Sequence, residues 1–302
     1  MPLKVSVIII TRHRPDMLHA CLEHLDKERD QDLEVVIADN SDPGKNESSK
    51  VAENFQWAIY LRIPHDRSFI TGSRNSGARR ATGEIYAFID DDSMVYPGWL
   101  AACREAYSDQ KVGAVGGRIL DPEVENLDPL RNDPIGKIYP NGYLSDNFDC
   151  TPKNTVQVQH LRGCNCSIRQ SLFERLGGFD ENIKGYGFDE FDLCLRITKA
   201  GYKIVHHTPM QIYHRLSPRE NSERITVSYK PRKTNIRNLS YSLAKHYGQF
   251  GITFLRFSFN LTPLKKLIRK PSGANFLLLI ATLHGRIEGF LASLTTRKIH
   301  IQ

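Results

Sequence analysis

Three consecutive aspartates have the residue type and spacing to bind a divalent cation. Asp90, Asp91 and Asp92 follow directly on an apolar run, residues 85–89, that is typical of a buried strand. Carboxylates this close repel one another, and a hard cation that takes oxygen ligands relieves the repulsion and can in turn hold the phosphates of a substrate. An acidic loop or a helix N-cap would contain the same residues. The triplet alone therefore leaves a metal site and a structural role open.

Polar residues also follow two other expected strands. Thr11 comes after the apolar run 5–10, and Asp39 comes after the run 33–38. In open α/β sheets, ligands bind in the crevice outside the carboxyl ends of the strands. We therefore expect Thr11, Asp39 and the three aspartates to share one site, although an Asx turn closing the second strand would also explain Asp39.

The spacing of apolar residues predicts an α/β fold with a mostly parallel central sheet that is covered by helices on both faces. Strands are expected at 5–10, 33–38, 57–63, 85–89, 112–115 and 203–206, and helices at 17–25, 72–81, 99–108, 171–176 and 192–200. Residues 121–160 show no clear period, so we expect them to form a long excursion over the sheet.

The net positive charge of the chain comes from its last third. Residues 215–302 carry 16 Lys and Arg against 3 Asp and Glu, whereas residues 1–214 carry 25 against 31. Apolar residues at helical spacing in 239–257 and 276–294 flank a basic cluster, Lys265, Lys266, Arg269 and Lys270. This pattern favours a mainly helical C-terminal region that lies on an anionic membrane surface, or that packs as a subdomain or in a homo-oligomer. Nucleic acid is not the expected partner, because the apolar residues form helical faces and do not alternate with basic ones as stacking platforms do.

The cysteines and the N-terminus indicate a cytoplasmic protein. The six cysteines are scattered, and the one close pair, Cys164 and Cys166, has no second pair with which to form a zinc site, so we expect reduced thiols. Residues 1–11 are typical of a strand and not of a signal peptide. The longest uncharged apolar stretch of the tail, 276–283, is too short to span a bilayer, so we expect at most peripheral binding to the inner face of the cell membrane.

Further motifs follow these features in a fixed order, and together they resemble glycosyltransferase family 2. The motifs are residues 88–92 with 97–100 behind them, 177–181, and 189–196 leading to 200–202. The resemblance covers residues 3 to about 214 and implies an inverting enzyme with the glycosyltransferase-A fold. It implies a catalytic domain at 1–214, with a nucleotide-sugar half at about 1–117 and an acceptor half at about 118–214, and leaves 215–302 as the basic, mainly helical extension. The implied pathway is the synthesis of cell-surface polysaccharide.

For the nucleotide-sugar donor, expected to be a UDP-sugar, the resemblance implies that Asp39 contacts the nucleobase. A uracil ring offers an N–H group that a carboxylate can accept. Thr11 and Arg14 would line the same pocket. Arg74 and Asn75 would lie beside the nucleotide, where an arginine can neutralise a diphosphate, although a solvated arginine on a helix face remains the alternative.

For the metal, the resemblance assigns unequal roles within an Asp-x-Asp (DXD) motif. Asp92 would bind Mn²⁺ or Mg²⁺, Asp90 would face the ribose side of the nucleotide, and Asp91 would lie between them. The cation would act as a Lewis acid on the departing diphosphate. A histidine after the last core strand often adds a ligand in this family, and His214 occupies that place, with His206 and His207 as rivals.

For the acceptor, the resemblance implies a carboxylate base that removes the proton of the attacking hydroxyl. The family pattern is commonly Glu-Asp-x-Asp with the second residue as base, whereas residues 189–192 read Asp-Glu-Phe-Asp. Glu190 is therefore the expected base, one methylene longer than usual, and Asp189 is the substitute. Asp192 would be structural or would orient the acceptor. All three would also be favoured simply as acids at a helix N-terminus.

A loop before the acceptor site is the last part of the resemblance. Gly163 and Asn165 would contact the acceptor, a glycan or a lipid-linked glycan, at a point where glycine allows the backbone to approach closely.

Three other functions fit the sequence less well or remain open. A nucleotidyltransferase would have a glycine-rich phosphate loop after the first strand, and residues 11–14 contain no glycine. A phosphohydrolase with an aspartate nucleophile would place its acidic motif after the first strand. A glycosyltransferase-like scaffold that binds nucleotide sugar or membrane without turnover stays open, because the Asp189–Glu190 order is unusual.

Overall fold

The computed structural model describes residues 2–64, 70–121, 133–139, 144–153, 155–215, 229–247, 268 and 273–299. The chain forms two compact units. The first contains Met1–Lys137, Ser145–Asp180 and Leu193–Ser217, and the second contains Ile138–Leu144, Glu181–Asp192 and Pro218–Gln302.

The first unit is built on a large sheet with the strand order β3-β2-β1-β4-β9-β6-β10-β8. Strand β1 is parallel to β2 and β4, β2 to β3, and β6 to β10, whereas β9 and β8 are antiparallel to their neighbours. The strands are β1 (Val5–Thr11), β2 (Leu33–Asp39), β3 (Ala58–Arg62), β4 (Ile85–Asp90), β6 (Val112–Gly116), β8 (Val156–Val158), β9 (Asn165–Arg169) and β10 (Lys203–His206). The predicted α/β fold with a mostly parallel sheet is confirmed.

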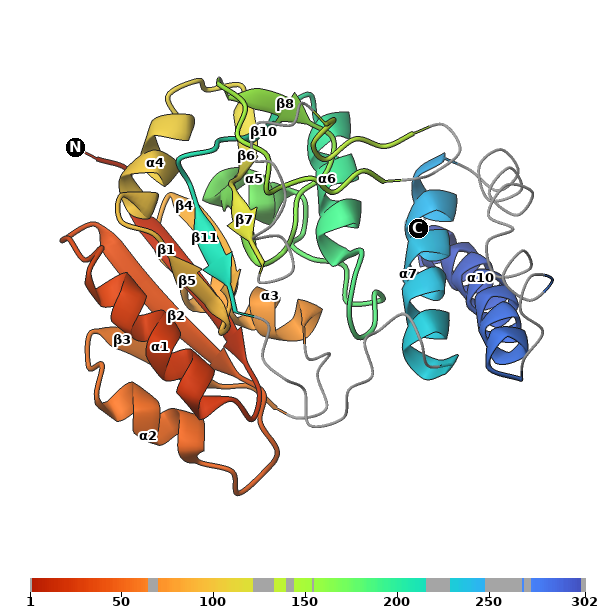
Figure 1. Cartoon of the computed structure of the whole chain (residues 1–302), viewed down its shortest axis with the longest axis horizontal. Coiled ribbons are helices and arrows are strands. Elements are labelled where there is room, and N and C mark those ends of the chain that lie inside the picture. The colour runs from red at the N-terminus through yellow and green to blue at the C-terminus, as the bar shows by residue number, and fades with distance from the viewer. Residues whose placement is uncertain are drawn as a thin grey trace. The chain divides into compact units, whose positions relative to one another are not determined.

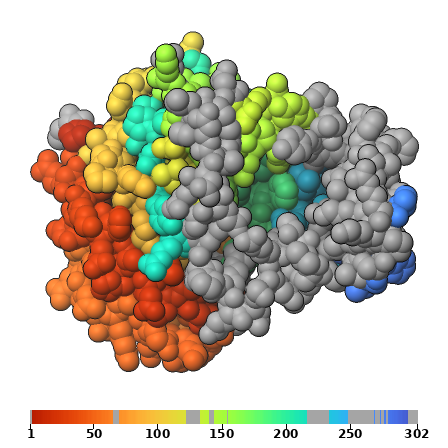
Figure 2. Space-filling view, viewed as in Figure 1, coloured from red at the N-terminus to blue at the C-terminus, as the bar shows by residue number. Residues whose placement is uncertain are grey.

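Helices cover the sheet on both faces, as the uniformly buried strands β1 and β6 require. Figure 1 shows α1 and α2 on the near face of the sheet and α5 behind it. The helices are α1 (Pro15–Asp26), α2 (Glu47–Glu53), α3 (Thr71–Arg80), α4 (Trp99–Ala106), α5 (Gln170–Arg175) and α6 (Asp189–Lys199). Helix α1 starts at Pro15, whose fixed φ suits the first helical position, and Leu18, Cys21, Leu22 and Leu25 form its buried face. On the surface, the residues of these first elements form one continuous red to orange area (Figure 2).

A second, three-stranded sheet was not predicted from the sequence. It has the order β5-β11-β7 and consists of β5 (Ser93–Val95), β11 (Ile212–His214) and β7 (Ile119–Leu120). Strands of two or three residues show no measurable alternation of apolar and polar side chains, so the sequence carries no signal for them. Their consequence is long-range, because β11 brings a late segment of the chain beside the end of β4.

The second unit contains two long helices, α7 (Tyr229–Tyr247) and α10 (Gly273–Ile299), which pack against each other. Two glycines one turn apart on α10 allow a close approach. A Cβ atom added to Gly285 would lie 2.3 Å from the carbonyl oxygen of Lys233, and one added to Gly289 would lie 2.2 Å from that of Arg237. Lys233 also pairs with Glu288 at 2.6 Å. The expected helical C-terminal region therefore includes a closely packed helix pair.

The basic cluster on which the membrane prediction partly rests falls outside the part of the chain that the structure describes. Lys265, Lys266, Arg269 and Lys270 all lie outside the described residues. Among the helices that are described, we find none with the length and apolar character needed to cross a bilayer.

A buried histidine near the end of β10 should make the stability of the fold depend on pH. Burial lowers the pKa of His206 to about 4 from its ordinary value of 6.5. The unfolded chain therefore binds a proton that the folded chain does not, so stability present above pH 6.5 is lost as the pH falls toward 4. Between pH 7 and pH 4.5, the free energy of unfolding measured in urea should fall by roughly 2–3 kcal/mol less for His206→Phe than for the wild type.

The matched control for this experiment is His19→Gln, because the side chain of His19 is half-exposed. It should keep the wild-type slope of stability against pH. Equal slopes for His206→Phe and the wild type would show that His206 is not the group responsible.

Candidate donor and metal site

The three predicted polar strand ends lie side by side. In the parallel ladders, Thr11 is in register with Asp39, and Ile10 is in register with Asp90. The sequence prediction that these residues meet at one edge of the sheet is therefore geometrically sound, because the three strands β2, β1 and β4 are neighbours.

Asp91 is the structural member of the aspartate triplet. Its carboxylate is fully buried, accepts a hydrogen bond from Thr11 Oγ1 at 2.7 Å, and pairs with Arg14. Burial raises the pKa of Asp91 to about 7, against the opposing charge of Arg14. Thr11 and Arg14, expected in the nucleotide pocket, thus hold the aspartate triplet in place.

Asp90, Asp92 and His214 form a cluster that could hold a metal ion. Each offers one ligand atom, and the three atoms lie within 4.8 Å of one another. The small sheet explains the convergence: His214 of β11 is in register with Ser93 of β5, the residue that follows Asp92. Arg215 N donates to the carbonyl oxygen of Asp92 at 2.8 Å and fixes the two segments. Two carboxylates and an imidazole suit Mn²⁺ or Mg²⁺, which would take phosphate oxygens as further ligands.

His214 is oriented from both sides of its ring. Its Nε2 lies 3.2 Å from Asp92 Oδ1, and its Nδ1 lies 2.8 Å from Asp121 Oδ1. Arg162 in turn pairs with Asp121 at 3.3 Å. A carboxylate on the far nitrogen fixes the ring orientation and raises the basicity of a ligating histidine. Neither rival histidine shares this arrangement: His206 is buried against Phe148, and His207 Nδ1 lies 2.7 Å from Thr155 Oγ1.

The electrostatics of this cluster favour a cation. Burial opposes ionisation of Asp92, but the hydrogen bond with His214 and the charge of Arg14 hold the pKa of its carboxyl below the usual value. Burial likewise opposes the charge on His214, while Cys164, Asp121 and Asp92 favour it and raise the pKa of the imidazole to about 11. The negative surroundings that retain a proton on His214 would equally retain a divalent cation in its place.

Arg74 is buried and faces the triplet from α3. Its Nη2 donates to Asp90 Oδ1 and to the carbonyl oxygen of Gly163, each at 3.0 Å. A Cβ atom on residue 163 would lie 2.6 Å from the guanidinium, so glycine is required there for this approach. The alternative of a solvated arginine is excluded for Arg74, and Gly163 has a structural reason to be glycine that does not involve an acceptor.

Asn75 and Asn165 have their amide groups committed to the fold. The Asn75 amide donates to the carbonyl oxygen of Phe179 and accepts from its N–H, each at 2.9 Å. Asn165 begins β9, where its amide accepts from Trp99 Nε1 at 3.1 Å and donates to the carbonyl oxygen of Met210 at 2.8 Å. Both side chains are buried. Their contacts to nucleotide and acceptor stay predictions, and the contacts observed favour structural roles.

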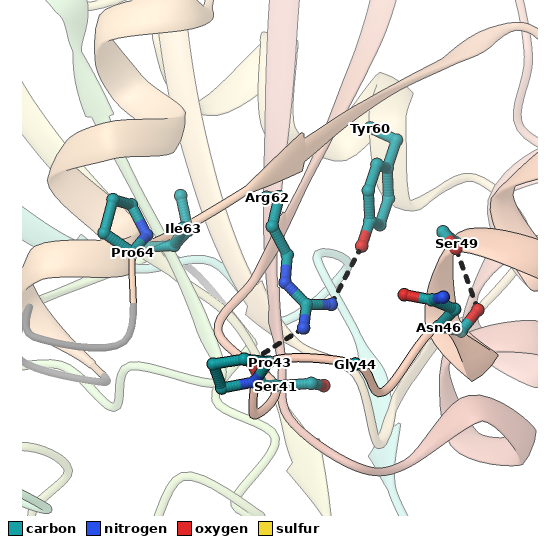
Figure 3. A pocket seen from close by; sticks show the side chains of 9 residues that line it. All are labelled: Ser41, Pro43, Gly44, Asn46, Ser49, Tyr60, Arg62, Ile63 and Pro64. Carbon is teal, nitrogen blue, oxygen red and sulfur yellow. Dashed lines mark hydrogen bonds between the residues drawn. The ribbon is translucent and has the colours of Figure 1, made fainter.

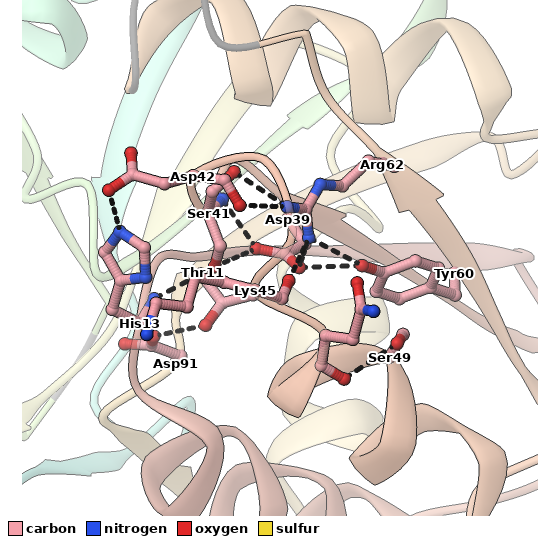
Figure 4. A network of polar contacts seen from close by, with 11 residues as sticks. Thr11, His13, Asp39, Ser41, Asp42, Lys45, Ser49, Tyr60, Arg62 and Asp91 are labelled. Atoms are coloured by element: carbon pink, nitrogen blue, oxygen red, sulfur yellow. Dashed lines mark hydrogen bonds and ion pairs between the residues drawn. The ribbon is translucent and has the colours of Figure 1, made fainter.

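Asp39 lies in a closed network of donors, which Figure 4 shows. Its Oδ1 accepts from Ser41 N at 2.8 Å and from Ser41 Oγ at 2.5 Å, which is the Asx turn considered as an alternative. Its Oδ2 accepts from the Tyr60 hydroxyl at 2.7 Å and from Arg62 Nη1 at 2.8 Å. Because the carboxylate is fully buried and already accepts four hydrogen bonds, contact with a nucleobase would require one of these donors to move.

A pocket of about 520 Å³ adjoins this network (Figure 3). Its polar groups come from both ends of the loop after β2 and from β3. Arg62 spans the loop, since its Nη2 donates to the carbonyl oxygens of Ser41 at 2.9 Å and Asp42 at 2.6 Å. The lining residues are Ser41, Pro43, Gly44, Asn46, Ser49, Tyr60, Arg62, Ile63 and Pro64.

The acidic motif of α6 begins in the second unit. The structure starts the helix at Asp189, three residues before the predicted start, and puts all three acids in its first turn. Asp189 and Asp192 are buried, and Glu190 is partly exposed. Glu190 is thus the carboxylate of the motif most accessible to a substrate.

Asp121, Arg62 and Tyr60 are three neighbours of this site that the sequence did not indicate. Asp121 opens the segment without periodicity, and Tyr60 and Arg62 lie on the weakest predicted strand. Alternation along β3 places Tyr60 and Arg62 on one face, which is the one signal that could have drawn attention to them.

The fold and this edge of the sheet define a domain of the glycosyltransferase-A type. A family model for Glycosyl transferase family 2 matches residues 6–177, and one for Glycosyltransferase like family 2 matches residues 150–257. The chain belongs to glycosyltransferase family 2.

Curated relatives agree with this assignment. The chain is 27% identical over 233 residues to the O-antigen biosynthesis protein RfbC of Myxococcus xanthus, covering 74% of this chain and 18% of that protein. It is 24% identical over 225 residues to the glucosyl-dolichyl phosphate glucuronosyltransferase of Haloferax volcanii, covering 71% of this chain and 70% of that protein. The first two curated relatives are thus much longer, since the chain spans 18% and 25% of them.

Two solved structures share the fold. GalNAc-T7 with UDP, GalNAc and Mn²⁺ superposes with a TM-score of 0.66 at 14% identity, covering 93% of this chain and 54% of that one. The mannosyltransferase PcManGT of Pyrobaculum calidifontis, in complex with GDP-Man and Mn²⁺, gives 0.59 at 18% identity, covering 98% of this chain and 87% of that one.

Proposed function

We propose that this protein transfers a sugar, with inversion, from a nucleotide-sugar donor to a hydroxyl group of a glycan or a lipid-linked glycan. The observation that carries the proposal is the convergence of Asp90, Asp92 and His214 at the carboxyl edge of the sheet. Residues 1–214 would form the catalytic domain. The O-antigen protein and the dolichyl phosphate enzyme among the relatives support a role in the assembly of surface polysaccharides.

Asp92 and His214 would hold Mn²⁺ or Mg²⁺, with Asp90 facing the ribose side of the nucleotide. When bound, the cation would stabilise the negative charge that develops on the diphosphate leaving group. Arg14 pairs with both Asp91 and Asp92. The positive charge of Arg14 offsets the repulsion between these two carboxylates and so allows the three aspartates to lie close together.

The donor side would be formed by the strand ends of β1, β2 and β4. The neighbouring structures contain UDP or GDP-Man, so both nucleotides are candidates, and the pocket beside Asp39 offers donors and acceptors for a base. A UDP-sugar remains the expected donor. A carboxylate such as Asp39 can accept the N–H of uracil, as it can those of guanine, if Tyr60 or Arg62 gives up its hydrogen bond, so the nucleotide screen must decide between the two bases.

Glu190 would act as the general base. The role requires a carboxylate that can reach a substrate hydroxyl, and Glu190 is the partly exposed acid of its motif. Asp189 remains the substitute.

A thermal-shift screen of nucleotides and nucleotide sugars, with Mn²⁺ or with excess EDTA, tests the donor proposal. At 100 times its Kd, a ligand that binds only the folded state should stabilise it by about 2.7 kcal/mol, which is a shift of several degrees. We expect one donor to give this shift in Mn²⁺ and a much smaller one in EDTA. The absence of a shift with every nucleotide in Mn²⁺ would contradict the proposal.

A further inference from the structure

The loop that precedes the acidic motif is held by one buried side chain of α7. Asn238 is fully buried, and its amide donates to the carbonyl oxygens of Lys184 at 2.7 Å and Gly187 at 3.2 Å, while its Oδ1 accepts from Lys184 N at 3.3 Å. One residue earlier on α7, Arg237 donates to the carbonyl oxygen of Asn182 at 2.7 Å. Residues 182–187 are thus fixed along their backbone to α7.

The backbone of this loop leaves little room for adjustment. Gly187 has φ = 91°, and a Cβ atom added to it would lie 2.4 Å from Asn235 Oδ1. The next residue, Phe188, has φ = 70°, in the left-handed region that non-glycine residues rarely adopt. A strained residue persists where its surroundings determine its conformation, and here it lies directly before Asp189.

Asp192, one turn into α6, is held by the last turn of α7. Its fully buried Oδ1 lies 3.0 Å from Lys245 Nζ and 2.8 Å from His246 Nε2. A buried carboxylate with two such partners is committed to the fold, because removing the partners would leave a charge uncompensated. This arrangement favours the structural role for Asp192 over contact with an acceptor.

We propose that α7 is the positioning element of the acidic motif: Asn238 in the middle of the helix, and Lys245 and His246 in its last turn, fix residues 182–192 and thereby orient Asp189 and Glu190. The proposal rests on the proposed function for the catalytic role of Glu190. It gives the C-terminal helices a role in the reaction that requires neither a membrane nor a second copy of the chain. The glycines of α10 support the arrangement, since they allow α10 to pack closely on α7.

Two variants of His246, each combined with Lys245→Met, provide the central test. His246→Phe keeps a ring but removes the donor to Asp192, whereas His246→Gln keeps an N–H group. We expect hydrogen exchange of the backbone amides of 182–192 to accelerate about tenfold or more in His246→Phe combined with Lys245→Met. The kcat for sugar transfer should fall roughly 10- to 100-fold in this double variant, because small misplacement of a catalytic group is costly. The affinity for Mn²⁺ and nucleotide should stay unchanged, and His246→Gln in the same Lys245→Met background should recover most of the loss.

A second pair of variants, both in α10, leaves Lys245 and His246 intact and so tests the attachment of the motif without placing a new side chain beside Asp192. Gly289→Ala should disturb the packing of α10 on α7, whereas Gly273→Ala, where a Cβ atom meets nothing within 4 Å, should not. The proposal is supported if hydrogen exchange of residues 182–192 accelerates in Gly289→Ala but not in Gly273→Ala.

Unchanged exchange in the double variant would overturn the proposal, and so would faster exchange with a wild-type kcat. Because hydrogen exchange needs no substrate, it decides whether α7 holds the motif even if the wild type transferred no sugar. A wild-type protein that transfers no sugar would contradict the proposed function but not the attachment of the motif to α7.

Discussion

Replacing Asp92 with alanine should lower kcat/KM for sugar transfer by roughly 10³-fold, because it removes a ligand that stabilises charge in the transition state. Asp92 is buried, pairs with Arg14 at 2.6 Å, and lies 3.2 Å from His214 Nε2. Its loss would therefore also release the two cationic side chains that shape the site. Turnover should be measured with the donor found in the nucleotide screen. The affinity for Mn²⁺ should be measured by electron paramagnetic resonance, and we expect it to weaken in parallel.

Asp109→Asn is the matched control for this substitution. Asp109 is an exposed carboxylate that pairs with Lys203 at 3.0 Å, so its neutralisation changes the net charge of the protein equally without touching the site. Full activity of Asp92→Ala in excess EDTA would refute the metal role. A loss of activity with unchanged Mn²⁺ affinity would move the metal ligand from Asp92 to another residue.

The positions of the three strand ends could be predicted because each depends on a local pattern. Residues 5–10, 33–38 and 85–89 are mostly apolar, with Ser6 and Glu34 as interruptions, and each segment is followed at once by a polar residue. The rules of parallel sheets then place Thr11, Asp39 and Asp90 at one edge, and the observed register agrees. Here a short-range signal was sufficient to predict a long-range contact.

The partners of these residues could not be predicted in the same way. Asp121 reaches His214 across 93 positions of the chain, through two strands of two and three residues. Asn165 looked like part of a loop because it follows Gly163, yet it starts an antiparallel strand inserted between β4 and β6. Side chains such as Arg62 and Asn238 hold the backbone by hydrogen bonds to carbonyl oxygens, and every sequence offers such acceptors, so no residue pattern marks them.

Glu190→Gln should lower kcat without changing the binding of donor or Mn²⁺, which would distinguish a general base from a residue that binds substrate or metal. Glutamine keeps the shape of glutamate but cannot accept a proton, so kcat should fall by roughly 10²- to 10⁴-fold while the affinities for donor and Mn²⁺ stay unchanged. Asp189→Asn is the internal comparison, since Asp189 is buried beside it. Both should be assayed for transfer to acceptor and for hydrolysis of the donor by water.

The two variants have three informative outcomes. A loss of kcat in Glu190→Gln and not in Asp189→Asn supports Glu190 as the base. The reverse result would assign the base to Asp189 and explain why the family order Glu-Asp is inverted here. If the wild type binds donor and Mn²⁺ but neither transfers nor hydrolyses the sugar, the inverted order marks a nucleotide-sugar-binding scaffold, and the acids at 189–192 serve only the first turn of α6.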